Sequence, residues 1–188
     1  MEKRQQLVEA ALTLFYQHSV HGTGINDVLA LAGVARKTLY HHFDSKEALL
    51  LAALELRDQR WCDWLQQRLT SASSLNDLIK QLFNALDDWF NERELAPFYG
   101  CFFQQCASEY SQSDSDVWQY CHQHQQRVLT LLQQHLQRVR SEPEQAQGQE
   151  KEQAIGLKLL LDGAIAQAQT GNCNAALDAK KLALTALV

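Results

Sequence analysis

Apolar residues recur every three or four positions along most of this chain, which is the spacing of helices that bury one face. Leu7, Leu14 and Phe15 share such a face and predict a first helix. The same spacing predicts a short helix over 25–32, ended by Gly33, and another over 36–43. No segment alternates between apolar and polar residues as a strand does. The predicted fold is therefore all-α, with about nine helices.

Capping signals divide the rest of the chain into further helices. Asp44 and Glu47 have the spacing of a capping box, and they predict a long helix that continues to about Thr70. The remaining helix starts are predicted at Ser74, at Pro97, at Ser113, near Pro143 and after Asn174.

Composition narrows the class of protein. The 188 residues are 46% hydrophobic and 21% charged, which indicates a globular chain rather than a disordered one. No apolar run reaches the roughly 18 residues of a membrane span, and the N-terminus lacks the apolar stretch of a signal peptide. Because the five cysteines are irregularly spaced, we expect no disulfide framework and a reducing cytoplasm. We expect no cofactor and no metal site.

Charge is unevenly distributed along the chain. The formal net charge is −5, yet residues 1–47 hold five Lys or Arg and five acidic residues and are neutral. The acidic excess therefore lies in residues 48–188. The net charge alone hides any local basic surface.

Residues 25–43 carry the strongest functional signal. A short helix, a turn at Gly33 and a second short helix form the helix-turn-helix unit, whose second helix enters the major groove of DNA. Here the second helix begins with Arg36 and Lys37, and arginine can bind guanine through two hydrogen bonds. Thr23 and Lys46 stand at helix N-termini that could meet phosphates. The predicted partner is a double-stranded DNA operator, contacted by Thr23, Arg36, Lys37, Thr38, Tyr40, His41 and Lys46.

This segment resembles the N-terminal domain of the TetR (tetracycline-repressor) family of transcriptional regulators. The resemblance covers residues 1 to about 50. Three positions depart from the family pattern: Ala35 stands where a serine cap is usual, Lys37 where the residue is usually small, and Leu29 where alanine is common. The matching residues are Thr23, Asp27, Ala32-Gly33-Val34, Thr38-Leu39-Tyr40, His42-Phe43, Ser45-Lys46-Glu47 and Leu49.

The resemblance implies a helix-turn-helix DNA-binding domain at 1–47 and an effector-binding and dimerisation domain at 48–188. It implies a ligand-responsive regulator, most commonly a repressor that a small molecule releases from its operator. The different-class alternative is an enzyme. No glycine-rich phosphate loop, nucleophile motif or paired-histidine metal motif supports it.

Aromatic residues point to where an effector would bind. Twelve of the sixteen lie in 61–120, and an apolar pocket with a few polar groups is the usual small-molecule site. This enrichment predicts a small, largely apolar or aromatic effector, although any single ring is more often a core residue. The candidates are Trp61, Trp64, Phe83, Trp89, Phe98, Phe102, Phe103 and Trp118.

Small and apolar residues form stripes on the last two predicted helices. Such stripes suit a self-complementary four-helix dimer interface, or packing within one chain. A homodimer also follows from DNA geometry, because two recognition helices must lie about 34–36 Å apart. The stripes are Ile155, Leu159, Gly163 and Ala166, and Ala175, Ala179, Leu182 and Ala186.

Cysteines offer an alternative regulatory chemistry. A thiol- or electrophile-sensing regulator would use Cys101, Cys106 or Cys121, and it would need an exposed thiolate with a lowered pKa. A free cysteine more often packs as a small apolar residue. Cys121 and His124 have the spacing of two metal ligands on a helix, but no further ligand is identifiable.

Overall fold

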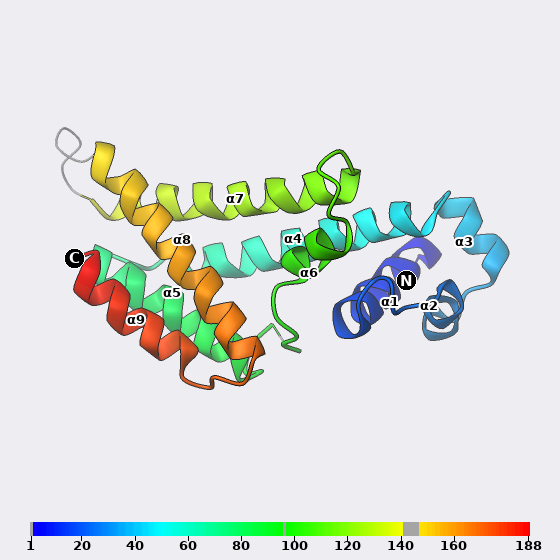
Figure 1. Cartoon of the computed structure of the whole chain (residues 1–188), viewed down its shortest axis with the longest axis horizontal. Coiled ribbons are helices and arrows are strands. Elements are labelled where there is room, and N and C mark those ends of the chain that lie inside the picture. The colour runs from blue at the N-terminus through cyan, green and yellow to red at the C-terminus, as the bar shows by residue number, and fades with distance from the viewer. Residues whose placement is uncertain (1, 96, 141–146) are drawn as a thin grey trace. The chain divides into compact units, whose positions relative to one another are not determined.

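The computed structural model describes residues 2–95, 97–140 and 147–188, and this part of the chain forms nine α-helices and no strand (Figure 1). The all-α prediction is therefore confirmed. The helices are α1 (Lys3–His18), α2 (Ile25–Ala32), α3 (Arg36–His42), α4 (Lys46–Leu69), α5 (Leu75–Phe90), α6 (Phe102–Glu109), α7 (Asp116–Val139), α8 (Gln147–Gln169) and α9 (Ala175–Ala186).

Local signals located most helix ends to within a few residues. The Ser74 cap is confirmed, because the Asp77 N–H donates to its hydroxyl at 3.2 Å. The cap predicted at Asp44 lies one residue too early. Ser45 caps α4, and its hydroxyl accepts a hydrogen bond from the Ala48 N–H at 3.0 Å. The start of α7 is likewise capped by Ser115 rather than Ser113. The start predicted near Pro143 lies outside the described residues.

The helix predicted at Pro97 is wrong, because α6 begins only at Phe102. The preceding loop contains Glu92 at φ 54° and Leu95 at φ 53°. A left-handed backbone cannot continue a right-handed helix and is unfavourable for residues with a side chain. Contacts from other helices, described below, stabilise this loop.

The chain divides into two compact units, each made from two stretches of sequence. The first contains residues 1–60 and 101–124, and the second contains 61–100 and 125–188. The long helices α4 and α7 each contribute one part to either unit. The functional division after residue 47 stays a prediction, whereas the packed units are discontinuous in sequence.

The first unit is built around the face of α1 that the apolar spacing predicted. Leu7 and Phe15 of α1 are fully buried, as are Val28 of α2 and Leu39 of α3. Both short helices pack on α1. The position of α3 is thus set by apolar contacts on its inner side.

In the second unit, α5 packs against α8 and α9, and α8 packs against α9 (Figure 1). Ala175, Ala179 and Ala183 of α9 are buried, and their small side chains allow close approach of the neighbouring helices. The predicted stripe on α9 therefore packs partly within the chain. Among the described residues, every helix is too short or too polar to cross a membrane.

Candidate functional site

The predicted recognition helix, α3, is anchored at one buried side chain. Leu39 is fully buried, and its carbonyl accepts a hydrogen bond from the Phe43 N–H at 2.9 Å, which ends the helix. Ala35 precedes the helix and provides no side-chain cap, as its sequence position predicts. Since Leu39 is the only buried residue of the helix, the opposite face is available to a partner.

The turn before α3 depends on Gly33. This residue has φ 63° and ψ 34°, the left-handed conformation that favours glycine. The N–H of Val34 donates to the Leu29 carbonyl at 3.2 Å, which closes the end of α2. Gly33 therefore lets the chain change direction within the three residues that separate α2 from α3.

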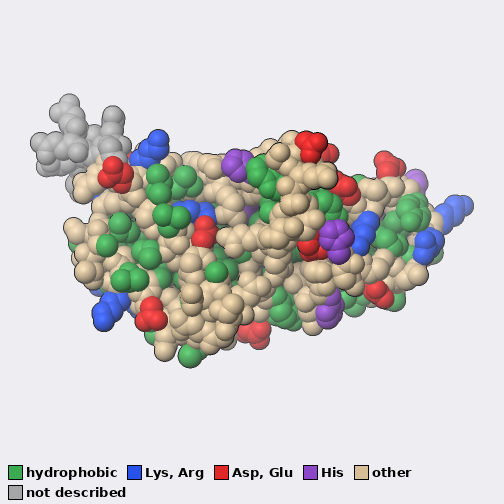
Figure 2. Space-filling view, viewed as in Figure 1, with side chains coloured by type: hydrophobic (Ala, Val, Ile, Leu, Met, Phe, Trp, Pro, Cys, Tyr) green, Lys and Arg blue, Asp and Glu red, His purple; other side chains and the backbone are tan. Residues whose placement is uncertain are grey.

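Arg36 and Lys37 are exposed at the start of α3. The Arg36 guanidinium donates a hydrogen bond to the side-chain oxygen of Asn26 on α2. The Asn26 side chain carries no charge, so this bond leaves the Arg36 charge unpaired among the described residues. In the described part of the chain, neither cation forms an ion pair. Figure 2 shows Lys and Arg side chains at the surface over the end of the unit that carries α2 and α3. Among the described residues, the charges of Arg36 and Lys37 are thus not neutralised and can attract an anionic partner.

Three further predicted contacts share this helix with the cations. Tyr40 is 49% exposed. His41 is exposed and Thr38 is half-buried. The structure thus gathers Arg36, Lys37, Thr38, Tyr40 and His41 on one short helix.

Thr23 and Lys46, the other two predicted contacts, have side chains that bind inside the first unit. Thr23 is 4% exposed, and its hydroxyl donates to the Ser19 carbonyl at 2.8 Å. The Lys46 ammonium donates to the Val20 carbonyl at 2.6 Å and lies 5.7 Å from the centre of the Phe15 ring. A phosphate contact by either side chain would compete with these bonds.

The predicted effector-binding aromatics fall into two groups. In the second unit, Trp89 is central: its ring centre lies 6.2 Å from that of Trp61, 6.3 Å from Trp64 and 5.0 Å from Phe98. Phe83 is fully buried in the same unit. Trp61, Trp64, Trp89 and Phe98 thus form one continuous aromatic cluster, called here the Trp89 cluster.

The remaining three aromatics belong to the first unit. Phe103 stacks on His124, with ring centres 3.5 Å apart, and the His124 Nδ1 lies 2.6 Å from the Asp58 carboxylate. Phe102 is buried, and Trp118 stacks on His122. His124 thus has a carboxylate partner, and Asp58, Cys62 and His124 offer possible ligand atoms that lie within 4.8 Å of one another. Cys121, which was paired with His124 from its spacing, is not in this group.

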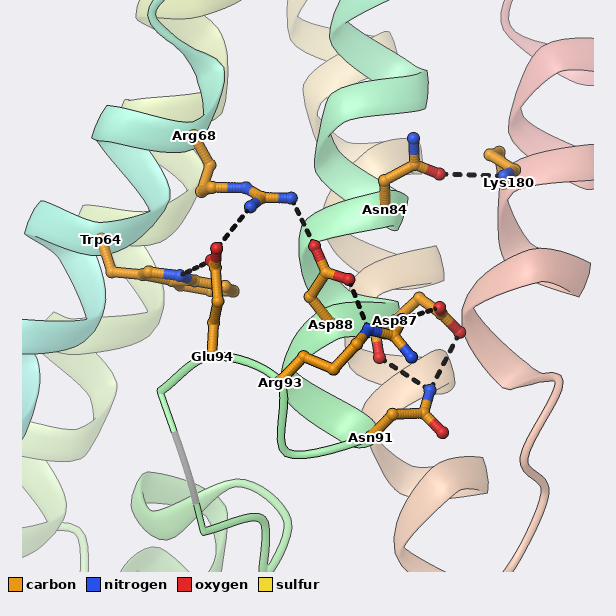
Figure 3. A network of polar contacts seen from close by, with 9 residues as sticks. All are labelled: Trp64, Arg68, Asn84, Asp87, Asp88, Asn91, Arg93, Glu94 and Lys180. Atoms are coloured by element: carbon orange, nitrogen blue, oxygen red, sulfur yellow. Dashed lines mark hydrogen bonds and ion pairs between the residues drawn. The ribbon is translucent and has the colours of Figure 1, made fainter.

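An ion-pair network lies beside the Trp89 cluster in the second unit (Figure 3). Arg68 of α4 donates to Asp88 of α5 at 2.7 Å and to Glu94 of the following loop at 2.9 Å. Glu94 also accepts from the Trp64 indole N–H at 3.0 Å, and Arg93 donates to Asp88 at 2.8 Å. These bonds stabilise the loop that contains Glu92 and Leu95, the two residues with a left-handed backbone. A helix was predicted to begin just after this loop, at Pro97.

The same network perturbs Asp88. Partial burial opposes ionisation of this carboxyl, but hydrogen bonds from Arg93 and Arg68 stabilise the charged form, so that its pKa is lowered from the ordinary value. Arg93 also donates to Asp87, on the adjacent position of α5. The cations of this region are therefore neutralised by carboxylates.

The cysteines named for thiol sensing are buried. Cys106 is fully buried, Cys121 is 2% exposed and Cys101 is 8% exposed. Burial raises the pKa of Cys106 far above its usual range and raises the pKa of Cys121 to about 12. Since sensing needs an accessible thiolate, the structure does not favour this alternative.

Two cavities are formed by other residues than the eight aromatic candidates. One, of about 540 Å³, lies in the first unit, where Phe43, Leu51 and Tyr120 contribute to its lining together with Arg4 and Asp116. The other, of about 350 Å³, lies in the second unit between polar residues of α4, α5 and their connection, including Arg68 and Gln81. The aromatic pocket stays a prediction.

Two residues that no sequence pattern singles out contact the helix-turn-helix segment. Asn26 binds Arg36 from ten positions upstream, and Glu109 binds the turn between α1 and α2 from α6. No local pattern links residues 21 and 109, so only the folded chain brings them together.

An exposed cationic helix after a left-handed glycine, on an all-α fold, defines a helix-turn-helix protein. Residues 7–53 match the family model of bacterial regulatory proteins of the tetR family. The HTH-type transcriptional repressor KstR2 of Mycolicibacterium smegmatis is 36% identical over 87 residues, which are 44% of this chain and 40% of that protein. The chain thus spans less than half the length of this curated relative.

Solved structures extend the likeness to the whole fold. The TetR-family regulator SCO4454 of Streptomyces coelicolor superposes with a TM-score of 0.84 at 24% identity, over 98% of this chain and 94% of that one. A cysteine mutant of the TetR family regulator CifR, complexed with a 26-bp operator DNA, superposes with a TM-score of 0.81 at 18% identity, over 100% of this chain and 98% of that one. The sequence likeness to the TetR family thus covers residues 7–53, and the solved structures show that the whole chain shares their fold.

Proposed function

We propose that this protein is a cytoplasmic DNA-binding transcriptional repressor rather than an enzyme. It binds a double-stranded operator as a homodimer through α3, and a small, largely apolar or aromatic effector releases it from DNA. Names of similar proteins, a repressor and a regulator bound to operator DNA, support the same class of function.

The exposed start of α3 is the observation that carries this proposal. Arg36 and Lys37 are exposed without an ion pair in the described part of the chain, on a helix whose inner side is fixed by Leu39. A rigid helix with cations at its N-terminal end suits insertion into the major groove. Arg36 is assigned to base recognition, and Lys37, Thr38, Tyr40 and His41 to neighbouring base or phosphate contacts.

The direct test is a binding titration with duplexes from the DNA that flanks the gene of this protein. We expect one duplex to bind at least about 1,000-fold more tightly than a scrambled duplex at moderate salt, in the usual range for specific regulators. Equal affinity for all duplexes would contradict the proposal.

Exposed apolar residues of α8 and α9 support the homodimer. Leu159 is 66% exposed, Leu182 is 58% exposed and Ile155 is 40% exposed. Figure 2 shows hydrophobic patches over the region where α8 and α9 lie. The double variant Leu159→Glu, Leu182→Glu should sediment as a monomer while the wild type sediments as a dimer. Leu31→Glu, which changes an exposed leucine of α2, is the control and should stay dimeric.

The Trp89 cluster supports an apolar or aromatic effector. A thermal-shift screen that includes aromatic compounds should identify stabilising ligands, and these should also lower operator affinity. Trp64→Ala should weaken their binding and leave DNA affinity without ligand unchanged. Stabilising ligands that bind Trp64→Ala as tightly as wild type would exclude this cluster as their site.

A further inference from the structure

The turn between α1 and α2, residues Ser19–Thr23, is strained. Ser19 has φ 69° and ψ 162°, a conformation that is almost restricted to glycine. Such a residue persists only where its surroundings fix it. This turn connects α1, on which both short helices pack, to the helix-turn-helix, so that its conformation bears on the position of α3.

Glu109, the last residue of α6, binds this turn through its carboxylate. One oxygen accepts from the Val20 N–H at 3.0 Å, and the other accepts from the His21 N–H at 2.6 Å. The second oxygen also lies 2.8 Å from the His21 Nδ1. The Glu109 side chain is 17% exposed, which strengthens these charge-assisted bonds relative to a fully solvated carboxylate.

Neighbouring groups complete the binding of this turn. The carbonyl of Val20 accepts from the Lys46 ammonium at 2.6 Å, so that both backbone groups of this buried residue bind charged side chains. The His21 ring stacks on Tyr110, with ring centres 5.5 Å apart. Because a buried backbone N–H needs a partner, loss of the Glu109 carboxylate would leave the Val20 N–H without one.

We propose that Glu109 is a positioning residue for operator binding. It stabilises the strained α1–α2 turn and thereby fixes α2 and α3 for insertion into DNA, although it lies on α6 and belongs to none of the predicted DNA contacts. This inference rests on the proposed function for its effect on DNA, whereas its structural part can be tested without DNA.

The test compares Glu109→Gln with Asp114→Asn in the full chain. Both variants remove one negative charge from the segment around the end of α6, but Asp114 is exposed and lies in the loop that follows α6. Glutamine keeps the size of the side chain and loses one of its two acceptor oxygens. His21→Ala removes the ring contacts and keeps both backbone N–H groups.

Hydrogen exchange reports on the turn itself. We expect Glu109→Gln to accelerate amide exchange by at least about tenfold at Val20 or His21, whichever N–H loses its acceptor, with no such change in Asp114→Asn. Unchanged exchange at both amides would overturn the proposal whether or not the protein binds DNA.

Operator binding reports on the consequence. Glu109→Gln should lower operator affinity by about tenfold, while its affinity for a scrambled duplex matches that of Asp114→Asn. His21→Ala should have a smaller effect. Operator affinity equal to that of Asp114→Asn, or an equal loss on both duplexes, would overturn the positioning role. If wild type prefers no duplex, the proposed function fails, and with it the effect on DNA; the exchange result then decides the structural part.

Discussion

The two units differ in what surrounds their arginine side chains: a neutral side chain in the first unit and carboxylates in the second. Arg36 of the first unit is exposed and binds only the neutral Asn26 among the contacts described above. Arg68 of the second unit is bound by two carboxylates, those of Asp88 and Glu94. The same residue type is therefore available to an external anion in one unit and neutralised by internal ones in the other. The net charge of −5 cannot show this difference.

The largest expected effect separates these two arginines directly. Arg36→Ala should reduce the preference for operator over scrambled duplex by about 10- to 100-fold, since a base contact is worth about 1–3 kcal/mol. Arg68→Ala is the control. It should change operator affinity less than about twofold and should lower the unfolding free energy of the second unit by about 1 kcal/mol. Fluorescence anisotropy measures DNA affinity, and urea unfolding measures the free energy of unfolding. If Arg36→Ala and Arg68→Ala changed operator affinity equally, the two arginines would not differ in their role in DNA binding.

Lys46 tests whether an internal bond excludes a phosphate contact. A lysine that contacts phosphate lowers the slope of log affinity against log salt by about one when it is removed. Because the Lys46 ammonium binds the Val20 carbonyl, we expect Lys46→Met to weaken operator binding by several-fold, about 1 kcal/mol, with an unchanged slope. Lys37→Met should lower the slope. Titrations at several salt concentrations distinguish the two, and a lower slope for Lys46→Met would restore the phosphate contact.

Lowering the pH should reveal how much the ion pairs of the second unit contribute to the free energy of unfolding. Asp88 has a lowered pKa in the folded chain, so its contribution to stability is present above its ordinary pKa and is lost as pH falls through the folded value. Between about pH 5 and pH 3, wild type should lose up to about 1 kcal/mol more than Asp88→Asn. Urea unfolding across this range measures the difference. Parallel curves for the two proteins would show that Asp88 does not titrate in this way.

The smallest expected effect concerns His135, whose protonated form is disfavoured in the folded second unit. Burial and the nearby Arg138 guanidinium lower the pKa of His135, so the unfolded chain binds its proton first as pH falls below about 6.5. The stability of wild type should therefore decrease from about pH 7 to pH 5, by less than about 1 kcal/mol. His135→Gln should be flatter over this range in urea unfolding. A wild-type curve as flat as that of the variant would contradict the assignment.

The helix-turn-helix could be predicted from the sequence because its determinants are close together in the chain. Leu39 anchors α3, Gly33 ends α2, and both act within a few residues of the groups they position. The bounds of α2 were predicted as they are observed. The conformation of residues 91–95 could not be predicted, because Arg68 of α4 supplies part of their hydrogen bonding.

By itself, the sequence determined the all-α class, the helix-turn-helix and the residues available on α3, since helical spacing and turn chemistry are local properties. Only the tertiary structure decided which charged groups are neutralised, that Lys46 and Thr23 bind inward, and that Glu109 meets the α1–α2 turn. Those contacts join segments up to 89 positions apart. Their energies depend on burial and on partners that no local pattern specifies.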